Sequence, residues 1–106
     1  MLPTQESPGL PRYRLTARAE ADVVKIIRYG IETFGVPQAR RYNDELTRCF
    51  ELLAENPHMG RPALEFGDGV RRHGHARHVV LYEIFEEGVL VLPVIHMRSL
   101  IRFLKP

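Results

Sequence analysis

The sequence contains no tryptophan, a single cysteine and no long hydrophobic run. One cysteine cannot form a disulfide within the chain, so a disulfide-stapled scaffold is excluded. The longest apolar stretch, residues 89–95, contains Pro93 and is far too short to span a bilayer. No positively charged segment followed by an apolar one opens the chain, as a secretory signal requires. We therefore expect a cytoplasmic protein with no membrane partner.

The length and composition are those of one small globular domain. The chain has 106 residues, of which 44% are hydrophobic and 26% charged, so wholesale disorder is not expected. Residues 1–12 contain three prolines and are expected to form a flexible leader, and residues 13–106 a single domain. Cys49 lies among apolar positions at helical spacing, which favours a buried structural role over a nucleophilic one.

The first half of the chain predicts a short strand followed by two helices. Residues 13–16 alternate as a strand does, and the Thr16 hydroxyl can cap a following helix. Apolar residues then recur at three- and four-residue steps until Gly35, which ends the first helix. Pro37 suits the first turn of a second helix, which closes at Asn56. The apolar face of the first helix comprises Val23, Ile26, Ile27, Ile31 and Phe34, and that of the second Ala39, Tyr42, Leu46, Cys49, Phe50 and Leu53.

The second half predicts a sheet for these helices to cover. Residues 70–73, 78–85 and 89–95 have the composition of strands, and Pro93 predicts an edge position or a bulge because it cannot donate to a ladder. The connection around Gly35 is so short that the two helices must fold back on each other. We therefore predict an α+β fold: a short N-terminal strand, an antiparallel two-helix hairpin, and a three-stranded antiparallel meander packed on the helices.

Residues 70–78 form a basic stretch without an acidic residue, in a chain whose pI is about 9.0. The stretch suits an acidic partner, and it equally suits a solvated strand whose arginines pair with nearby glutamates. His73, His75 and His78 alternate within it, but no cysteine or carboxylate joins them at a known ligand spacing. We expect neither a metal nor a cofactor.

Several short motifs follow one another in an order typical of a known family. They are the helix connection Phe34-Gly35-Val36, the loop of residues 56–62, the strand of residues 77–82 and the ending of residues 94–98. In this order and at these separations, they resemble the RelE/ParE superfamily of type II toxins, with ParE-like members the nearest. The resemblance implies a toxin of the plasmid-stabilisation type, held inactive by a ParD-like antitoxin that wraps around it.

The superfamily has two activities, and the residues favour one of them. RelE-like members are ribosome-dependent mRNA endoribonucleases, whereas ParE-like members are held to poison DNA gyrase. A ribonuclease needs several acid, base or cationic groups around one phosphate, and Arg72, His78, His96 and Arg98 are candidates to converge at one end of the sheet.

The catalytic set of the RelE-like pattern is nevertheless incomplete in this chain. That pattern places an arginine three residues before the strand tyrosine, where this chain has Val79 before Tyr82. It also places a tyrosine shortly after the arginine that matches Arg98, and this chain has none there. We therefore expect no catalytic residue and a toxin that acts on gyrase by binding rather than as an enzyme, with the ribonuclease as the alternative.

The residues expected to contact the antitoxin or the target are basic or titratable. They are Arg61, Arg71, Arg72, Arg77, His78, His96 and Arg98. For Arg61, a structural role in tying its loop to carbonyls or to a glutamate ranks ahead of partner binding. His96 equally fits a strand-end histidine satisfied by the backbone, and Tyr82 a core residue whose hydroxyl reaches the surface. Residues 99–104 are either a gyrase contact or part of the core.

A non-toxic nucleic-acid-binding module is a further interpretation of a small basic α+β chain. Single-stranded recognition favours aromatic side chains side by side on exposed strands. Tyr82 and Phe85 lie an odd number of positions apart and so point to opposite faces of their strand. We therefore expect no direct sequence-specific DNA binding by this chain alone.

Overall fold

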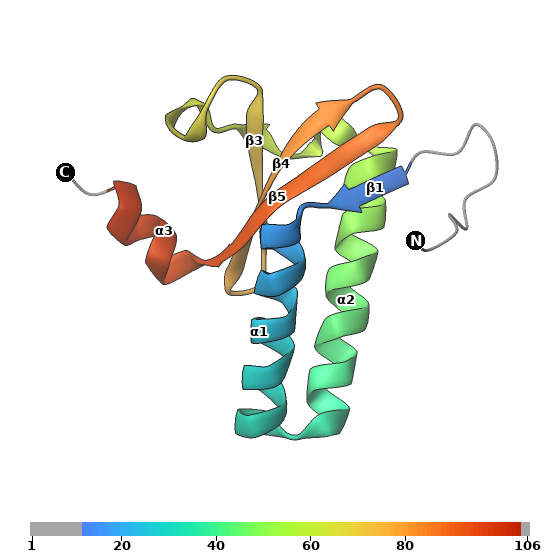
Figure 1. The fold of residues 1–106 in the computed structure, drawn as a ribbon, viewed down its shortest axis with the longest axis vertical. Coiled ribbons are helices and arrows are strands. Elements are labelled where there is room, and N and C mark those ends of the chain that lie inside the picture. Colours follow the sequence, from blue (N-terminus) through green and yellow to red (C-terminus); the bar gives the residue numbers. More distant parts are fainter. Residues whose placement is uncertain (1–11, 105–106) are drawn as a thin grey trace.

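The computed structural model describes the backbone of residues 12–104 and the side chains of residues 12–100. The leader predicted for residues 1–12 lies outside this part of the chain, except for Arg12. The elements, in chain order, are β1 (Arg12–Leu15), α1 (Ala17–Phe34), α2 (Val36–Glu55), the 3₁₀ turn η1 (Pro57–Met59), β2 (Arg61–Pro62), the 3₁₀ turn η2 (Leu64–Phe66), β3 (Val70–His75), β4 (His78–Phe85), β5 (Gly88–His96) and α3 (Met97–Leu104) (Figure 1). No helix of residues 12–104 combines the length and apolar character needed to cross a membrane.

The two long helices begin and end where their capping residues predict. The Thr16 hydroxyl accepts a hydrogen bond from the Ala19 N–H at 3.0 Å, which caps α1. Gly35 has a φ of 93° and separates α1 from α2 without an intervening loop. Pro37 occupies the first turn of α2, where a missing N–H costs no helical bond. The predicted antiparallel hairpin is confirmed (Figure 1).

The sheet has five strands in the order β1-β5-β4-β3-β2. The predicted meander included only three of them, β3, β4 and β5. The antiparallel meander of β3, β4 and β5 is confirmed, but β1 pairs with β5 in parallel, so the sheet is mixed. Parallel pairing requires a long crossover connection, and the helical hairpin supplies it. The two-residue β2 pairs with β3 and is too short to show alternation in the sequence. The helix α3 was also not predicted.

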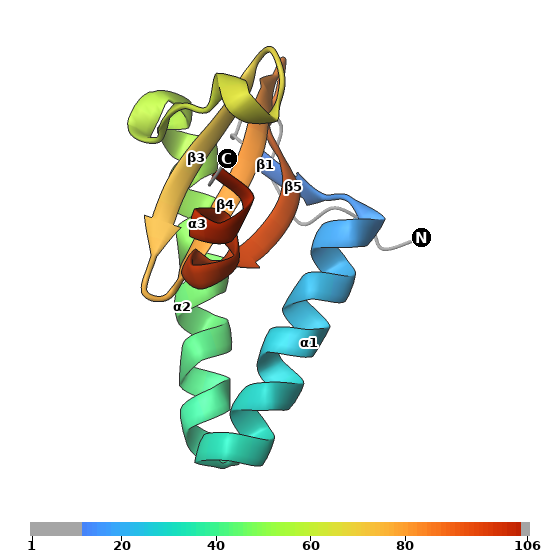
Figure 2. The same cartoon turned by 90° about the vertical axis from the view of Figure 1, so that its left-hand side faces the viewer.

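Both faces of the sheet are covered. The first core lies between the sheet and the helical hairpin and comprises Ala19, Leu46, Cys49, Phe50, Leu53, Ala54, Val80, Tyr82, Val89, Val91 and Val94. The second core lies on the opposite face, under η2 and α3, and comprises Ala63, Val70, Val79, Leu81 and Leu100 (Figure 2). The far half of the hairpin extends beyond the sheet, so Ile31 and Phe34 remain 43% and 52% exposed instead of fully buried (Figure 1).

The bulge predicted around Pro93 is confirmed, and α1 holds it in place. Val80 pairs with Val94 and Tyr82 with Val91, so two residues of β5 face one residue of β4. The Val94 N–H donates to the carboxylate of Asp22 at 2.9 Å. On the other side of the bulge, the Thr16 hydroxyl donates to the Leu92 carbonyl oxygen at 2.9 Å. The first turns of α1 therefore satisfy backbone groups that the bulge removes from the ladder.

Candidate functional site

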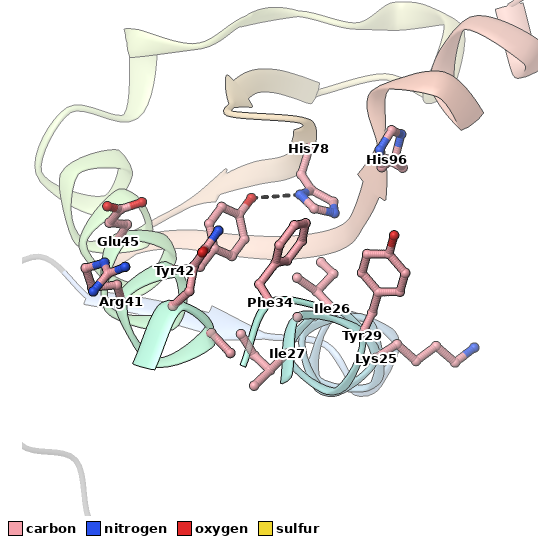
Figure 3. Close-up of a pocket in the computed structure, with 13 residues that line it drawn as sticks. Lys25, Ile26, Ile27, Tyr29, Phe34, Arg41, Tyr42, Glu45, His78 and His96 are labelled. Carbon is pink, nitrogen blue, oxygen red and sulfur yellow. Dashed lines mark hydrogen bonds between the residues drawn. The ribbon is translucent and has the colours of Figure 1, made fainter. Parts of the chain in front are cut away.

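A pocket of about 710 Å³ lies between the helical hairpin and one end of the sheet (Figure 3). Its wall is largely apolar and comes from the hairpin, whereas His78 and His96 reach it from the first residue of β4 and the last residue of β5. The lining residues are Lys25, Ile26, Ile27, Tyr29, Gly30, Phe34, Gln38, Ala39, Arg41, Tyr42, Glu45, His78 and His96. An apolar recess with a few convergent polar groups is typical of a binding site.

His78 is the polar centre of this pocket. Its Nδ1 lies 2.7 Å from the Tyr42 hydroxyl in a hydrogen bond in which either group can donate (Figure 3). Burial, followed by the neighbouring His96 and His75, lowers the pKa of His78 below its ordinary value of 6.5. Burial raises the pKa of Tyr42 to about 12, so its hydroxyl keeps its proton at neutral pH. The pair is thus neutral at pH 7.

His96 lines the pocket and lies directly before the last helix. Its Nδ1 accepts a hydrogen bond from the Arg98 N–H at 3.0 Å, which places the imidazole proton of the neutral ring on Nε2. The interpretation that the backbone satisfies His96 is confirmed, although the partner is an N–H rather than a carbonyl. Its ring centroid lies 5.4 Å from that of His78, its partner across the two strands.

The four groups suggested for a catalytic cluster do not all lie on one face of the sheet. His78 and His96 come together, but Arg72 lies opposite Leu81, a residue of the second core. Residues directly opposite in neighbouring strands share a face, so Arg72 is on the far side of the sheet from His78. Arg98 is exposed in the first turn of α3. Arg72 and His78 therefore cannot belong to one cluster, because side chains alternate between faces along the strands.

The arginines of the basic stretch have different partners in the structure. Arg72 pairs with Glu65 at 3.7 Å, as the solvated-strand interpretation expects. Arg71 donates to the Gly60 carbonyl oxygen at 2.6 Å and thus performs the loop-tying role expected of Arg61. Arg61 and Arg77 are exposed, at the sheet edge and in the β3–β4 turn respectively. Residues 12–100 include no cluster of three His, Cys, Asp or Glu side chains arranged to hold a metal ion.

Tyr82 and Val79 are both buried in the sheet. The Tyr82 hydroxyl does not reach the surface, because the residue is fully buried. It donates to the Pro57 carbonyl oxygen at 2.6 Å and accepts from the Gly60 N–H at 3.0 Å, which anchors the loop after α2. Val79 is 2% exposed within the second core, so no phosphate ligand occupies that position. Cys49 is buried as predicted, and burial raises the pKa of its thiol to about 11.

The family model of the ParE toxin of the type II toxin-antitoxin system parDE matches residues 13–101, which include the hairpin, the pocket and all of the sheet except Arg12. The chain belongs to the ParE toxin family. Toxin ParE1 of Caulobacter vibrioides is 42% identical over 72 residues, which cover 68% of this chain and 75% of that protein. Toxin ParE1 of Mycobacterium tuberculosis is 33% identical over 88 residues, which cover 82% of this chain and 90% of that protein.

A chain of known structure has the same fold. A chain from the chromosomal ParDE toxin-antitoxin system of P. aeruginosa superimposes with a TM-score of 0.70 at 15% identity, covering 82% of this chain and 96% of that one.

The pocket includes one residue, Tyr42, that the sequence assigned only to the core. Tyr42 follows the apolar spacing of α2, and only its position opposite the start of β4 brings its hydroxyl to His78.

Proposed function

We propose that this ParE-family toxin poisons DNA gyrase in the cytoplasm and that a ParD-like antitoxin neutralises it. The absence of a catalytic set at the candidate positions supports the proposal most directly. Val79 is a core residue, and Arg72 and His78 lie on opposite faces of the sheet. A toxin without a catalytic set acts by occupying a surface of its target, which fits a gyrase poison better than a ribonuclease.

The gyrase proposal predicts accumulation of cleaved DNA. Supercoiled plasmid incubated with gyrase, ATP and excess toxin should yield gyrase-linked double-strand breaks. Arg98 is exposed at the start of α3, so Arg98→Ala should reduce the yield. Arg48→Ala is the matched control, because Arg48 is exposed on α2 and makes only surface ion pairs. An unchanged level of cleaved DNA contradicts the proposal, and codon-specific mRNA fragments on programmed ribosomes, lost on Arg98→Ala, support the ribonuclease instead.

The C-terminal helix offers a second variant for the same assay. Leu100 is 4% exposed and belongs to the second core, so a deletion that begins at Ser99 would remove a core contact. A chain ending at Leu100 keeps that contact and lacks only residues 101–106. If the tail binds gyrase, this chain should retain its thermal stability and antitoxin binding but lose toxicity. Full toxicity of the shortened chain would show that the tail is not the gyrase contact.

We further propose that a helical segment of the antitoxin fills the pocket and that an extended segment pairs with an edge of the sheet. Phe34 lines the pocket and is exposed, so it can serve as the apolar anchor of the toxin in this contact. The proposed contacts to the antitoxin or target remain Arg61, Arg71, Arg72, Arg77, His78, His96 and Arg98. Arg71 and Arg72 already have internal partners, so exposed Arg77 is expected to contribute most of the salt dependence.

Replacing Phe34 with serine should weaken antitoxin binding by about 2 kcal/mol, roughly 30-fold, since it removes a central apolar anchor. Leu64→Ser is the control, because Leu64 is 68% exposed on η2, away from the hairpin. Isothermal titration at low salt with the product of the adjacent gene measures both. Equal losses for the two variants would place the antitoxin elsewhere.

A further inference from the structure

We infer that occupancy of the pocket is proton-linked: the antitoxin binds the form of the toxin in which His78 is neutral, and acidification releases it. This inference rests on the proposed antitoxin function and adds a regulatory property to the same site. The imidazole of His78 lies between the apolar wall of the pocket and two further histidines. A partner that fills the pocket buries this ring further and so favours its neutral form.

Among the described side chains of residues 12–100, no carboxylate forms an ion pair with His78. It pairs across the strands with His75 on one side and with His96 on the other. Its Nδ1 is occupied by the Tyr42 hydroxyl at 2.7 Å. Beyond the ring, the pocket wall is formed by Ile26 and other apolar side chains of the hairpin (Figure 3). A protonated His78 therefore gains only hydrogen bonding to a neutral phenol and faces two imidazoles.

Each element packed around His78 contributes charged or titratable groups to the pocket or to the strand positions beside it. They are Lys25 and Tyr29 of α1, Arg41, Tyr42 and Glu45 of α2, His75 of β3 and His96 of β5. Glu45 is the only carboxylate among the described pocket-lining residues, and it is exposed beside Arg41, whereas Lys25 lies on the other side of the pocket (Figure 3). Burial, followed by His96 and His75, thus disfavours a positive charge on His78 even before a partner binds.

The sign of the linkage follows from burial. In the free toxin, burial is the largest cause that lowers the pKa of His78, and the residue is only partly buried. An apolar side chain of the antitoxin that fills the pocket would bury His78 further, so the pKa falls further in the complex. Binding then loses strength as the pH falls through the free-state pKa toward the bound-state pKa. One proton gives a slope of at most about tenfold in affinity per pH unit.

The slope should correspond to no more than one proton. The Nε2 of His75 is buried without a hydrogen-bond partner, and the His75 ring lies 5.5 Å from that of Tyr42, beside His78. A positive charge on either neighbouring histidine lowers the pKa of His78 further, so His78 does not gain its proton independently of them.

The decisive experiment measures the dissociation constant of the full-length toxin with its antitoxin from about pH 8 to about pH 5 at constant ionic strength. We expect affinity to fall by up to about tenfold per pH unit below the free-state pKa of His78. His78→Gln keeps a polar side chain near Tyr42 and should flatten the profile. His58→Gln, at an exposed position on η1, should leave the profile unchanged.

Nuclear magnetic resonance titration of the His78 ring provides a readout that needs no variant. We expect its pKa to be lower in the complex than in the free toxin. A flat profile, tighter binding in acid, a slope that survives in His78→Gln, or a higher pKa in the complex would each overturn the proton linkage while leaving the antitoxin proposal intact. Failure to bind at any pH overturns the antitoxin proposal, and the linkage with it.

Discussion

Replacing Asp22 with alanine should lower the free energy of unfolding by about 2–3 kcal/mol. The Asp22 carboxylate accepts the Val94 N–H at 2.9 Å at the bulge of β5, and it also accepts from the guanidinium of Arg18 at 3.0 Å. Asp22 is 9% exposed, so alanine would leave a buried backbone donor without a partner, a loss worth about 1–3 kcal/mol. Removal of a carboxylate near the helix N-terminus adds about 0.3–1 kcal/mol.

Two further variants separate these contributions. Asp22→Asn keeps an oxygen that can accept the Val94 N–H and loses mainly the charge, so its cost should be about 1 kcal/mol. Glu20→Ala removes an exposed carboxylate from the same turn without a bond to the sheet and should cost less than about 0.5 kcal/mol. Chemical denaturation followed by circular dichroism measures all three. Similar values for Asp22→Ala and Glu20→Ala would mean that the bulge does not depend on α1.

Replacing Gly60 with alanine should destabilise the fold by about 3 kcal/mol or more. A Cβ at this position would lie 2.5 Å from both the Arg72 carbonyl oxygen and the Tyr82 hydroxyl, so backbone or core must shift. That shift would break the hydrogen bond from the Gly60 N–H to the Tyr82 hydroxyl at 3.0 Å. Overpacking of this kind costs about 1–3 kcal/mol, and a lost buried hydrogen bond adds about 1–3 kcal/mol.

Gly74→Ala is the matched control for this prediction. Gly74 lies in β3, and nothing stands within 4 Å of a Cβ built there. Alanine at this position should be neutral or slightly stabilising, since it reduces the entropy of the unfolded chain. Thermal unfolding of the two variants side by side measures the difference. If the Gly60→Ala and Gly74→Ala proteins had the same melting temperature, the loop after α2 would accommodate the added Cβ without strain.

Local signals in the sequence were sufficient to predict the hairpin and the meander. Thr16, Gly35 and Pro37 are capping and turn residues whose effect depends only on their neighbours in the chain, and the structure confirms each boundary. The bulge was predictable for the same reason, because Pro93 lacks the N–H that a regular ladder needs. The parallel β1–β5 pair was not, since it depends on where the chain returns after the helices.

The candidate site was predicted only in part, because it depends on which faces meet. The sequence identifies His78 and His96 as polar residues at strand ends, and the β4–β5 register brings them together. It does not show that Arg72 lies across the sheet from them. In the sequence, Asp22 is an acidic residue that favours the N-terminal end of a helix. Its hydrogen bond to β5 depends on the fold, which brings residues far apart in the chain side by side.

The bonds from the start of α1 to the bulge of β5 have a consequence for how the chain folds. They join residues separated by 72 and 76 positions, and the β1–β5 pairing spans a similar distance. Contacts of such high contact order form late, because closing a long loop costs entropy before any contact compensates for it. During synthesis, the helical hairpin can therefore form early, while β1 waits for β5 to leave the ribosome. The Val94 amide should then exchange with solvent only through the largest unfolding event of the domain.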